Sequence, residues 1–262
     1  MKRSSCTVAA VQPDSSGTPS EVLEDAVRLT RKVISLGAEI ICLPEHWIPG
    51  RHADMNAVIP EFSEVARGTG TYIVPGADFS TNNGVVKIES PVLGPKGEVG
   101  RTAKTHLFRR ERKMAVPGGS LDTFEIGEIR LGLAVCHDLV YPEVARTLVL
   151  DGADLILVPA MITETGYAPW ELYVKARALE NRVPIVSPNA VRPRLYHGGS
   201  LIVGFEIDRK EAIVEVRVIK RAGRRSGVIL ARLDLDAVKK LRTERLSSRR
   251  PELYSKLSMG RP

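Results

Sequence analysis

The stretch IRLGLAVCHDLVYPEVARTLVLDGADLILVPA, residues 129–160, decides the fold class. Its first eight residues, IRLGLAVC, form an apolar run of strand length. A helix is predicted from about Pro142 to Leu150, with Gly152 closing it, and DLILVPA follows as the next strand. A strand, a helix and a further strand in this order are typical of an α/β protein.

Towards the N-terminus the same alternation continues. The strand CTVAAVQ precedes a helix from about Ser20 to Leu36, for which Ser20 and Glu24 are the expected cap and Gly37 the end. The buried strand EIICLP comes next. A second helix is predicted over about Pro60 to Arg67, before the strand TYIVPGAD.

Towards the C-terminus a helix is predicted from Trp170 to Asn181, followed by the strand PIVSPNA. The segments SLIVGFEI and IVEVRVI indicate a hairpin. The strand VILARLDL and a short helix at about Asp236–Leu241 complete the pattern. Beyond it, we expect the tail, about residues 242–262, to be extended.

Several of the strands indicate antiparallel pairs. VVKIES leads into the turn GPKG at residues 94–97, and LDTFEI precedes IRLGLAVC. Mixed sheets covered by helices are therefore expected: an α/β layered sandwich in a single domain spanning 1–262. Periodicity alone does not choose between this sandwich and a doubly wound sheet.

Composition excludes some classes of protein. No uncharged apolar stretch approaches the roughly 20 residues that cross a bilayer, and Gln12, Pro13 and Asp14 break the first apolar run, so a soluble cytoplasmic protein is expected. Residues 209–250 hold 14 Lys and Arg against five Asp and Glu, within a net charge of +7. Because no aromatic residue interleaves them, we interpret this segment as a solvated hairpin and helix rather than a nucleic-acid site.

The three cysteines show neither disulfide nor zinc spacing. Cys6 and Cys42 lie inside apolar runs, as buried inert thiols usually do. Cys136 instead ends a strand at the turn into a helix. A thiol there feels the helix N-terminus, which favours the thiolate.

Two further polar residues, Glu45 and Lys104, also follow apolar strands. Clefts form at the carboxyl ends of strands in α/β sheets, so these side chains can converge with Cys136. A thiol, a carboxylate that moves protons and an ammonium that stabilises an oxyanion suffice for acyl transfer. Taken singly, each has an ordinary explanation: a turn carboxylate, a surface charge and a core thiol.

Together these segments resemble the carbon–nitrogen hydrolase (nitrilase) superfamily, in its amidase-like branch, over nearly the whole chain. The resemblance lies in ordered motifs: VAAVQ, ICLPEHWIPG, GRTAKTHLF, VPGGS, the segment 129–160, WELYVKARALENRVPIVSPN, GGSLIV and RRPELY. It implies a four-layer α-β-β-α sandwich. It also implies a Cys-Glu-Lys triad that works without a metal or organic cofactor.

Residue by residue, the resemblance makes Cys136 the nucleophile that forms a thioester and Glu45 the general base. Lys104 and the backbone N–H of His137 would stabilise the oxyanion. Glu111 fits a second active-site glutamate, although its basic surroundings, FRRERKMAV, also suit a solvent-facing residue paired with Arg109 or Arg112.

The run Cys136-His137-Asp138 and the short tail favour an amide substrate over a nitrile, since true nitrilases carry Cys-Trp-Glu there. Val140 stands where amidase-like members have an arginine, which removes any carboxylate-binding role of that arginine. Simple amides, ω-amides, dipeptide-like amides and carbamoyl amines all remain candidate substrates.

The residues expected at the pocket rim are His46, Trp47, Tyr141, Met161, Glu164 and Trp170. Trp170 could equally be a core packing residue. Asn189 could face the cleft or satisfy a buried turn.

Two other functions fit the sequence less well. A catalytically silent interaction module would be expected to have lost at least one of Glu45, Lys104 and Cys136. A glutaminase channelling ammonia would need an acceptor domain. Small-molecule amide and water are therefore the expected partners, together with a second copy of the chain. By resemblance, Pro142–Leu150, Trp170–Asn181 and the tail are the candidate surfaces for a homodimer or larger assembly.

Overall fold

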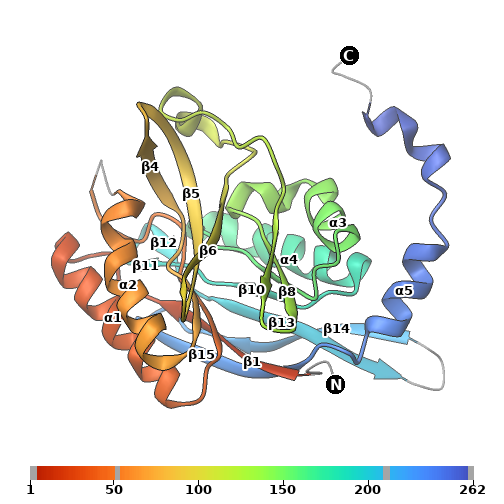
Figure 1. The fold of residues 1–262 in the computed structure, drawn as a ribbon, viewed down its shortest axis with the longest axis horizontal. Helices are drawn as coiled ribbons and strands as arrows, with labels where there is room; N and C mark the ends of the chain where they lie inside the picture. Colours follow the sequence, from red (N-terminus) through yellow and green to blue (C-terminus); the bar gives the residue numbers. More distant parts are fainter. Residues whose placement is uncertain (1–4, 51–53, 209–212, 259–262) are drawn as a thin grey trace.

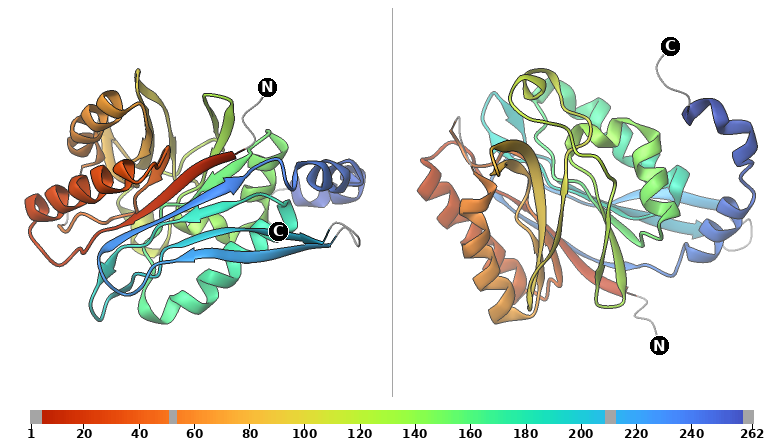
Figure 2. Two further views of the ribbon diagram at one scale, coloured as in Figure 1. Left: turned by 90° about the horizontal axis from the view of Figure 1, so that it is seen from below. Right: turned by 45° about the horizontal axis from the view of Figure 1, so that its top comes forward.

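A computed structural model describes residues 5–50, 54–208 and 213–258. The chain forms two stacked β-sheets with helices on both outer faces, seen in Figure 1 and, from two further sides, in Figure 2. Helices α1 (Pro19–Ser35) and α2 (Met55–Thr69) cover one sheet. Helices α3 (Pro142–Leu150) and α4 (Tyr167–Asn181) cover the other. The predicted α-β-β-α sandwich is confirmed.

The first sheet has the strand order β15-β1-β2-β3-β5-β4, with β6 also paired to β5. Its parallel centre, β1 to β3, is flanked by antiparallel strands. The bounds are β1 Ser5–Gln12, β2 Ile40–Cys42, β3 Tyr72–Val74, β4 Asp78–Asn82, β5 Val85–Gly94, β6 Gly97–Ala103 and β15 Gly227–Asp234.

The second sheet has the order β14-β13-β10-β9-β8-β7, in which β8, β9 and β10 are parallel. A separate two-stranded ribbon, β11 with β12, lies outside both sheets. The bounds are β7 Thr123–Ile126, β8 Ile129–Leu133, β9 Leu155–Leu157, β10 Ile185–Ser187, β11 Val191–Arg192, β12 Tyr196–His197, β13 Leu201–Asp208 and β14 Ile213–Arg221.

Alternation along the strands builds three layers of core. In β9, Leu155 and Leu157 point between the sheets, whereas Ile156 points towards α3 and α4. In β1, Val8 lies between the sheets and Ala9 beneath α1 and α2. Both faces of these strands are buried, so their sequences are continuous apolar runs. Hence periodicity could not distinguish the sandwich from a doubly wound sheet.

Two predicted helix starts were wrong. The cap of α1 is Thr18 with Glu21 rather than Ser20 with Glu24, because Thr18 and Glu21 form a reciprocal capping box. Helix α2 begins five residues before Pro60. The Asp54 carboxylate accepts a hydrogen bond from the backbone N–H of Asn56 and caps it.

The C-terminal predictions need two corrections. The last α-helix, α5, spans Lys239–Ser247 instead of Asp236–Leu241, and the tail is not extended, because a 3₁₀ helix, η4, covers Pro251–Ser258. Lys, Arg, Glu and Leu in this segment favour helix. Arg242 anchors α5 through Asp154 at 3.2 Å. Residues 259–262 lie outside the described residues.

The basic segment forms β14, β15 and α5, apart from residues 209–212, which the structure does not describe. Several of its arginines pair with acids, as Arg221 does with Glu171 at 2.7 Å. Among the described residues no helix combines the length and the apolar character that crossing a membrane requires.

Candidate active site

Three strand ends bring Glu45, Lys104 and Cys136 together. Glu45 follows β2, where it bridges to Ala77. Lys104 follows β6, and its backbone N–H donates to the carbonyl of Ile88 at 2.8 Å. Cys136 follows β8 and opens the 3₁₀ helix η2 (Cys136–Val140). Carboxyl ends of strands from both sheets therefore meet at this place.

The Lys104 ammonium lies between two carboxylates. Its Nζ is 2.7 Å from Glu45 Oε1 and 2.8 Å from Glu111 Oε1. Lys104 is 1% exposed, so the two short contacts compensate a buried charge. Glu111, in the 3₁₀ helix η1 (Arg109–Lys113), thus points inward and does not pair with Arg109 or Arg112.

The pKa values of this cluster follow from its opposed charges. Burial alone would lower the pKa of Lys104, but Glu45, Cys136 and Glu111 together raise it above its usual range. Burial would raise the pKa of Glu111, whereas His46 and Lys104 lower it to about 2. Lys104 is therefore an ammonium, and Glu111 a carboxylate, at neutral pH.

Cys136 adopts a backbone conformation that side chains rarely take, with φ of +44°. The residue as a whole is partly exposed. Burial raises the pKa of this thiol well above its usual value, and Glu45 raises it further, while Lys104 and a backbone hydrogen bond from Met161 lower it. The resting side chain is therefore a thiol rather than the thiolate expected from the helix N-terminus, because burial outweighs that effect. The Glu45 side chain lies beside it and can accept its proton.

Asp138 joins the turn after Cys136 to the segment after Lys104. Its buried carboxylate accepts hydrogen bonds from the backbone N–H groups of Thr105, His106 and Val135, at 3.1, 2.7 and 3.1 Å. The Thr105 hydroxyl adds a fourth, at 2.8 Å. Asp138 was not assigned a role from the sequence, although it directly follows the Cys136-His137 pair.

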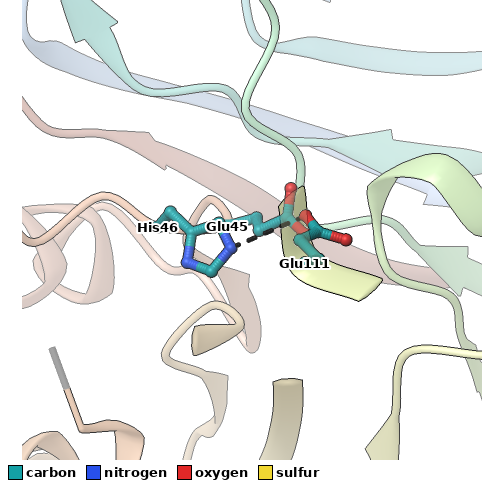
Figure 3. Close-up of side chains that lie close together, drawn as sticks. All are labelled: Glu45, His46 and Glu111. Carbon is teal, nitrogen blue, oxygen red and sulfur yellow. Dashed lines mark ion pairs between the residues drawn. The ribbon is translucent and has the colours of Figure 1, made fainter. Parts of the chain in front are cut away.

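The His46 ring contacts two carboxylates, those of Asp78 and Glu111. Its Nδ1 is 2.7 Å from Asp78 Oδ1, and its Nε2 is 3.8 Å from Glu111, the ion pair drawn in Figure 3. Burial lowers the pKa of His46, but Asp78, Glu111 and Glu45 together raise it to about 10. His46 is therefore a second cation in the cluster at neutral pH.

Glu45, His46 and Glu111 also satisfy a spacing that suits a metal ion, since their ligand atoms lie within 4.8 Å of one another. Lys104, however, already donates to an oxygen of each glutamate. A metal ion would have to displace that ammonium. The donor set thus fits the lysine better than it fits a metal.

A cavity of about 760 Å³ opens beside the cluster and reaches it through His46 and Met161. Both residues were expected at the pocket rim, and both line the cavity. Its remaining lining residues come from loops and, in equal number, from β4, η1 and the β11–β12 ribbon: Ser15, Ile48, Pro49, Gly50, Asp78, Phe79, Arg110, Met114, Arg192 and Tyr196. Apart from Asp78, which ends an apolar run, these residues carry no signal in the sequence that marks them as pocket residues.

Four residues expected at the rim do not line this cavity. Trp47 is 1% exposed, and its indole N–H donates to the Pro75 carbonyl in the core under α2. Trp170 is likewise buried, and its indole N–H donates a hydrogen bond to the Ser187 hydroxyl. Tyr141 stacks on His106, and Glu164 pairs with His197. Bulk and proximity to a strand end did not reveal which way these side chains point.

Asn189 satisfies a buried turn. Its Oδ1 accepts from the backbone N–H of Ile162 at 2.7 Å, and its Nδ2 donates to the Gly198 carbonyl at 2.7 Å. It therefore fixes the loop that presents Met161. The His137 ring contacts Phe108 rather than the carboxylates, which agrees with its interpretation as a lining or packing residue.

Comparison with known proteins decides the family. The sequence pattern described as carbon-nitrogen hydrolase matches residues 7–243. The chain belongs to the carbon-nitrogen hydrolase family. The predicted membership and the prediction of a hydrolase acting on carbon–nitrogen bonds are both confirmed at this level.

Curated relatives of this carbon-nitrogen hydrolase differ in their names. A nitrilase of Pyrococcus abyssi (strain GE5 / Orsay) is 33% identical over 201 residues, which are 70% of this chain and 75% of the relative. Omega-amidase NIT2 of Xenopus tropicalis is 28% identical over 272 residues, covering 92% of this chain and 93% of the relative.

Solved structures show the same fold. A carbon-nitrogen hydrolase from Helicobacter pylori G27 superposes with a TM-score of 0.85 at 18% identity, covering 99% of this chain and 100% of the other. An amidase from Nesterenkonia sp. gives a TM-score of 0.79 at 22% identity, with 97% of each chain covered. At these identities the likeness concerns the architecture alone.

Proposed function

We propose that this carbon-nitrogen hydrolase cleaves a small amide through a thioester on Cys136. The observation that supports the proposal most directly is the buried Lys104 ammonium, held at 2.7 Å and 2.8 Å by Glu45 and Glu111 beside a strained cysteine. A thiol, a base and an oxyanion-stabilising cation are the groups that acyl transfer requires.

In the acylation step Glu45 accepts the thiol proton as the sulfur attacks the amide carbon. The resulting oxyanion receives hydrogen bonds from Lys104 and from the backbone N–H of His137, in the first turn of η2, where helical N–H groups lack intrahelical acceptors. The intermediate collapses, the C–N bond breaks, and Glu45 returns the proton to the departing nitrogen. Ammonia or an amine leaves.

In the deacylation step Glu45 takes a proton from water, whose oxygen attacks the thioester carbon. The C–S bond then breaks, the carboxylic acid leaves, and the sulfur regains its proton from Glu45. Glu111 does not move protons in this scheme. Its negative charge holds Lys104 in place and keeps it an ammonium.

The first test is ammonia release from a panel of small aliphatic amides. We expect Cys136→Ala to lower kcat/KM at least ~10⁴-fold and Glu45→Gln to lower it ~10²- to 10⁴-fold. Cys6→Ala removes a buried thiol near the start of β1, whereas Glu45 follows the end of the parallel strand β2, and it should keep activity near the wild-type level. Intact-mass measurement during turnover should find the acyl group on Cys136. Ammonia release that survives Cys136→Ala rules the proposal out.

Nitriles and N-carbamoyl amines belong in the same panel, because the relative from Pyrococcus abyssi is named a nitrilase. Turnover of a nitrile alone would replace the amide proposal while keeping the thiol chemistry. A chain that processes none of the three would be the silent interaction module instead.

A further inference from the structure

The buried carboxylate of Asp138, which is 2% exposed, bonds to two segments of the proposed active site. Its Oδ1 accepts hydrogen bonds from the Thr105 hydroxyl at 2.8 Å and from the backbone N–H groups of Thr105 and His106 at 3.1 and 2.7 Å. Its Oδ2 accepts from the Val135 N–H at 3.1 Å, with a longer contact of 3.4 Å from the Thr105 N–H. One oxygen thus serves the segment after β6, and the other serves mainly the turn after β8.

These two segments belong to different sheets. Lys104 follows β6 in the first sheet, and Cys136 follows β8 in the second. Among the strands that the structure describes, β6 pairs with β5, and β8 pairs with β7 and β9. None of these ladders joins the lysine side to the cysteine side, so the Asp138 carboxylate links the two sides directly.

Asp138 also closes the first turn of η2. Its backbone N–H donates to the Val135 carbonyl at 3.0 Å, while its side chain accepts from the Val135 N–H. Between these two residues lie Cys136, with its strained φ of +44°, and His137. The same residue therefore holds the turn that carries the His137 N–H and the segment that follows Lys104.

We propose that Asp138 is a positioning residue that sets the separation of the two oxyanion donors, Lys104 Nζ and the His137 N–H. The inference rests on the proposed function, which assigns these donors to the tetrahedral intermediate. Such donors stabilise developing charge only where the fold holds them in advance at the required place. A change in their separation therefore lowers kcat and leaves binding of the amide itself unchanged.

The substitution Asp138→Asn keeps the size of the side chain and removes one acceptor. A carboxylate accepts at both oxygens, whereas a carboxamide accepts at one atom and donates at the other. Its NH₂ group would face either the Val135 N–H or the donors of Thr105 and His106. Either orientation breaks one of the two links and leaves a buried N–H without an acceptor.

The kinetic test uses butanamide and its aldehyde analogue, butanal. In the butanal adduct the Cys136 sulfur bonds to the carbonyl carbon, the π electron pair moves to oxygen, and Glu45 accepts the thiol proton. For Asp138→Asn we expect kcat on butanamide to fall ~10²-fold with KM within ~2-fold of the wild type, and butanal affinity to fall ~10²-fold. The butanal dissociation constant does not depend on the fraction of enzyme that is folded, so mere destabilisation would not change it.

Asp154→Asn is the matched control. The Asp154 carboxylate also accepts a backbone N–H, that of Arg130 at 3.2 Å, and it pairs with Arg242. It lies directly before β9, next to the start of β8, at the end of these strands opposite Cys136. This variant should lose stability and keep the wild-type kcat and butanal affinity.

Thr105→Val removes only the hydroxyl donor to Asp138, at a partly exposed position, and keeps the inference testable if Asp138→Asn does not fold. We expect it to lower kcat and butanal affinity ~3- to 10-fold. Wild-type values in Asp138→Asn, equal losses in Asp154→Asn, or wild-type values in Thr105→Val overturn the inference.

Crystal structures of the wild type and of the variant, Asp138→Asn or else Thr105→Val, separate this inference from the proposed function, because they require no turnover. We expect Lys104 Nζ and the His137 backbone nitrogen to change their separation by ~0.5–1 Å in Asp138→Asn, and by less in Thr105→Val. Such a change supports the inference even if no amide is hydrolysed. An unchanged separation overturns it even if ammonia release confirms the amidase activity.

Discussion

The backbone around the proposed site is strained at single residues. Among the described residues, six other than glycine have positive φ, and three of them flank the cluster: His46 after Glu45, Arg109 before Glu111, and Cys136 itself. Each such conformation costs of the order of 1–3 kcal/mol. A fold keeps strain of this kind where the surrounding contacts hold a side chain in a required direction. The strain is thus a second indication, independent of charge, that these residues form the functional site.

His46 offers a residue-scale prediction about pH. Its pKa, raised to about 10 chiefly by Asp78 against the opposing effect of burial, exceeds that of an unfolded histidine, about 6.5. The protonated ring therefore stabilises the folded state fully below pH 6.5, and this stabilisation is lost as pH rises towards 10. We expect wild-type stability to fall more steeply over that window than the stability of His46→Gln.

Proton NMR measures the titration directly, because the chain has only five histidines. One ring resonance should titrate near pH 10 and disappear in His46→Gln. The His137 resonance should titrate below its usual pH, since burial and the nearby Lys104 lower its pKa. A His46 resonance that titrates near pH 6.5 would contradict the charged His46–Asp78 pair.

Sequence reasoning identified the residues of the proposed catalytic cluster but not most residues that line the cavity beside it. Glu45, Lys104 and Cys136 each follow an apolar strand, but the resemblance to the carbon–nitrogen hydrolase superfamily was needed to select them as one set. Trp47 was misplaced because a tryptophan after a strand can turn into the core as readily as into a cleft. Arg110 and Arg192, which line the cavity, were missed because a five-residue 3₁₀ helix and a two-residue strand are too short to show a periodic pattern in sequence.

At the scale of elements, one glycine sets how closely two segments approach. A Cβ built on Gly118 would lie 2.2 Å from the carbonyl oxygen of Ala103, the residue before Lys104. The Gly118 N–H also donates to the Lys104 carbonyl at 2.8 Å. The loop after η1 therefore closes against the end of β6 and fixes the backbone that presents the lysine.

Gly118→Ala should consequently displace Lys104 from Glu45 and Glu111. We expect kcat/KM to fall ~10²-fold, in line with the sensitivity of catalysis to displacements of about 1 Å. Gly119→Ala is the matched control, because a Cβ there meets nothing within 4 Å. Steady-state kinetics of the two variants decide the matter. Unchanged activity in Gly118→Ala would show that the loop does not position the lysine.

Elements were predictable where local chemistry defines them. The predictions of β8, β9 and α3 agree with the structure. Apolar runs mark the two strands, and a proline and a closing glycine mark the limits of the helix. The start of α2 was missed because Pro60 suggested a first helical turn, whereas the Asp54 cap begins the helix earlier. The tail was predicted as extended because its helix-forming residues lie among prolines and arginines without an apolar face.

At the scale of the whole molecule, apolar side chains remain uncovered on one side. Leu150 and Leu172, on α3 and α4, and Leu253 and Tyr254, in η4, are exposed, with Leu172 67% and Leu253 61% exposed. Figure 1 shows α5 and η4 on the side of α3, opposite α1 and α2. Arg245 links α5 to the Leu179 carbonyl of α4 at 3.2 Å, so the tail begins at this face.

We propose that a second copy of the chain covers these residues, as expected for the segments around α3, α4 and the tail. A stable interface buries ~1,200–2,000 Å² and places apolar side chains at its centre.

Leu172→Glu and Leu253→Glu should each weaken dimerisation at least ~10-fold, because a carboxylate would be buried against apolar surface. Leu36→Glu, at the end of α1 and 58% exposed, is the matched control. Sedimentation over a range of protein concentrations should find a dimer for the wild type and for Leu36→Glu, and a shift towards monomer for the other two. A wild type that sediments as a monomer throughout, or identical behaviour of all three variants, would refute the second-copy proposal.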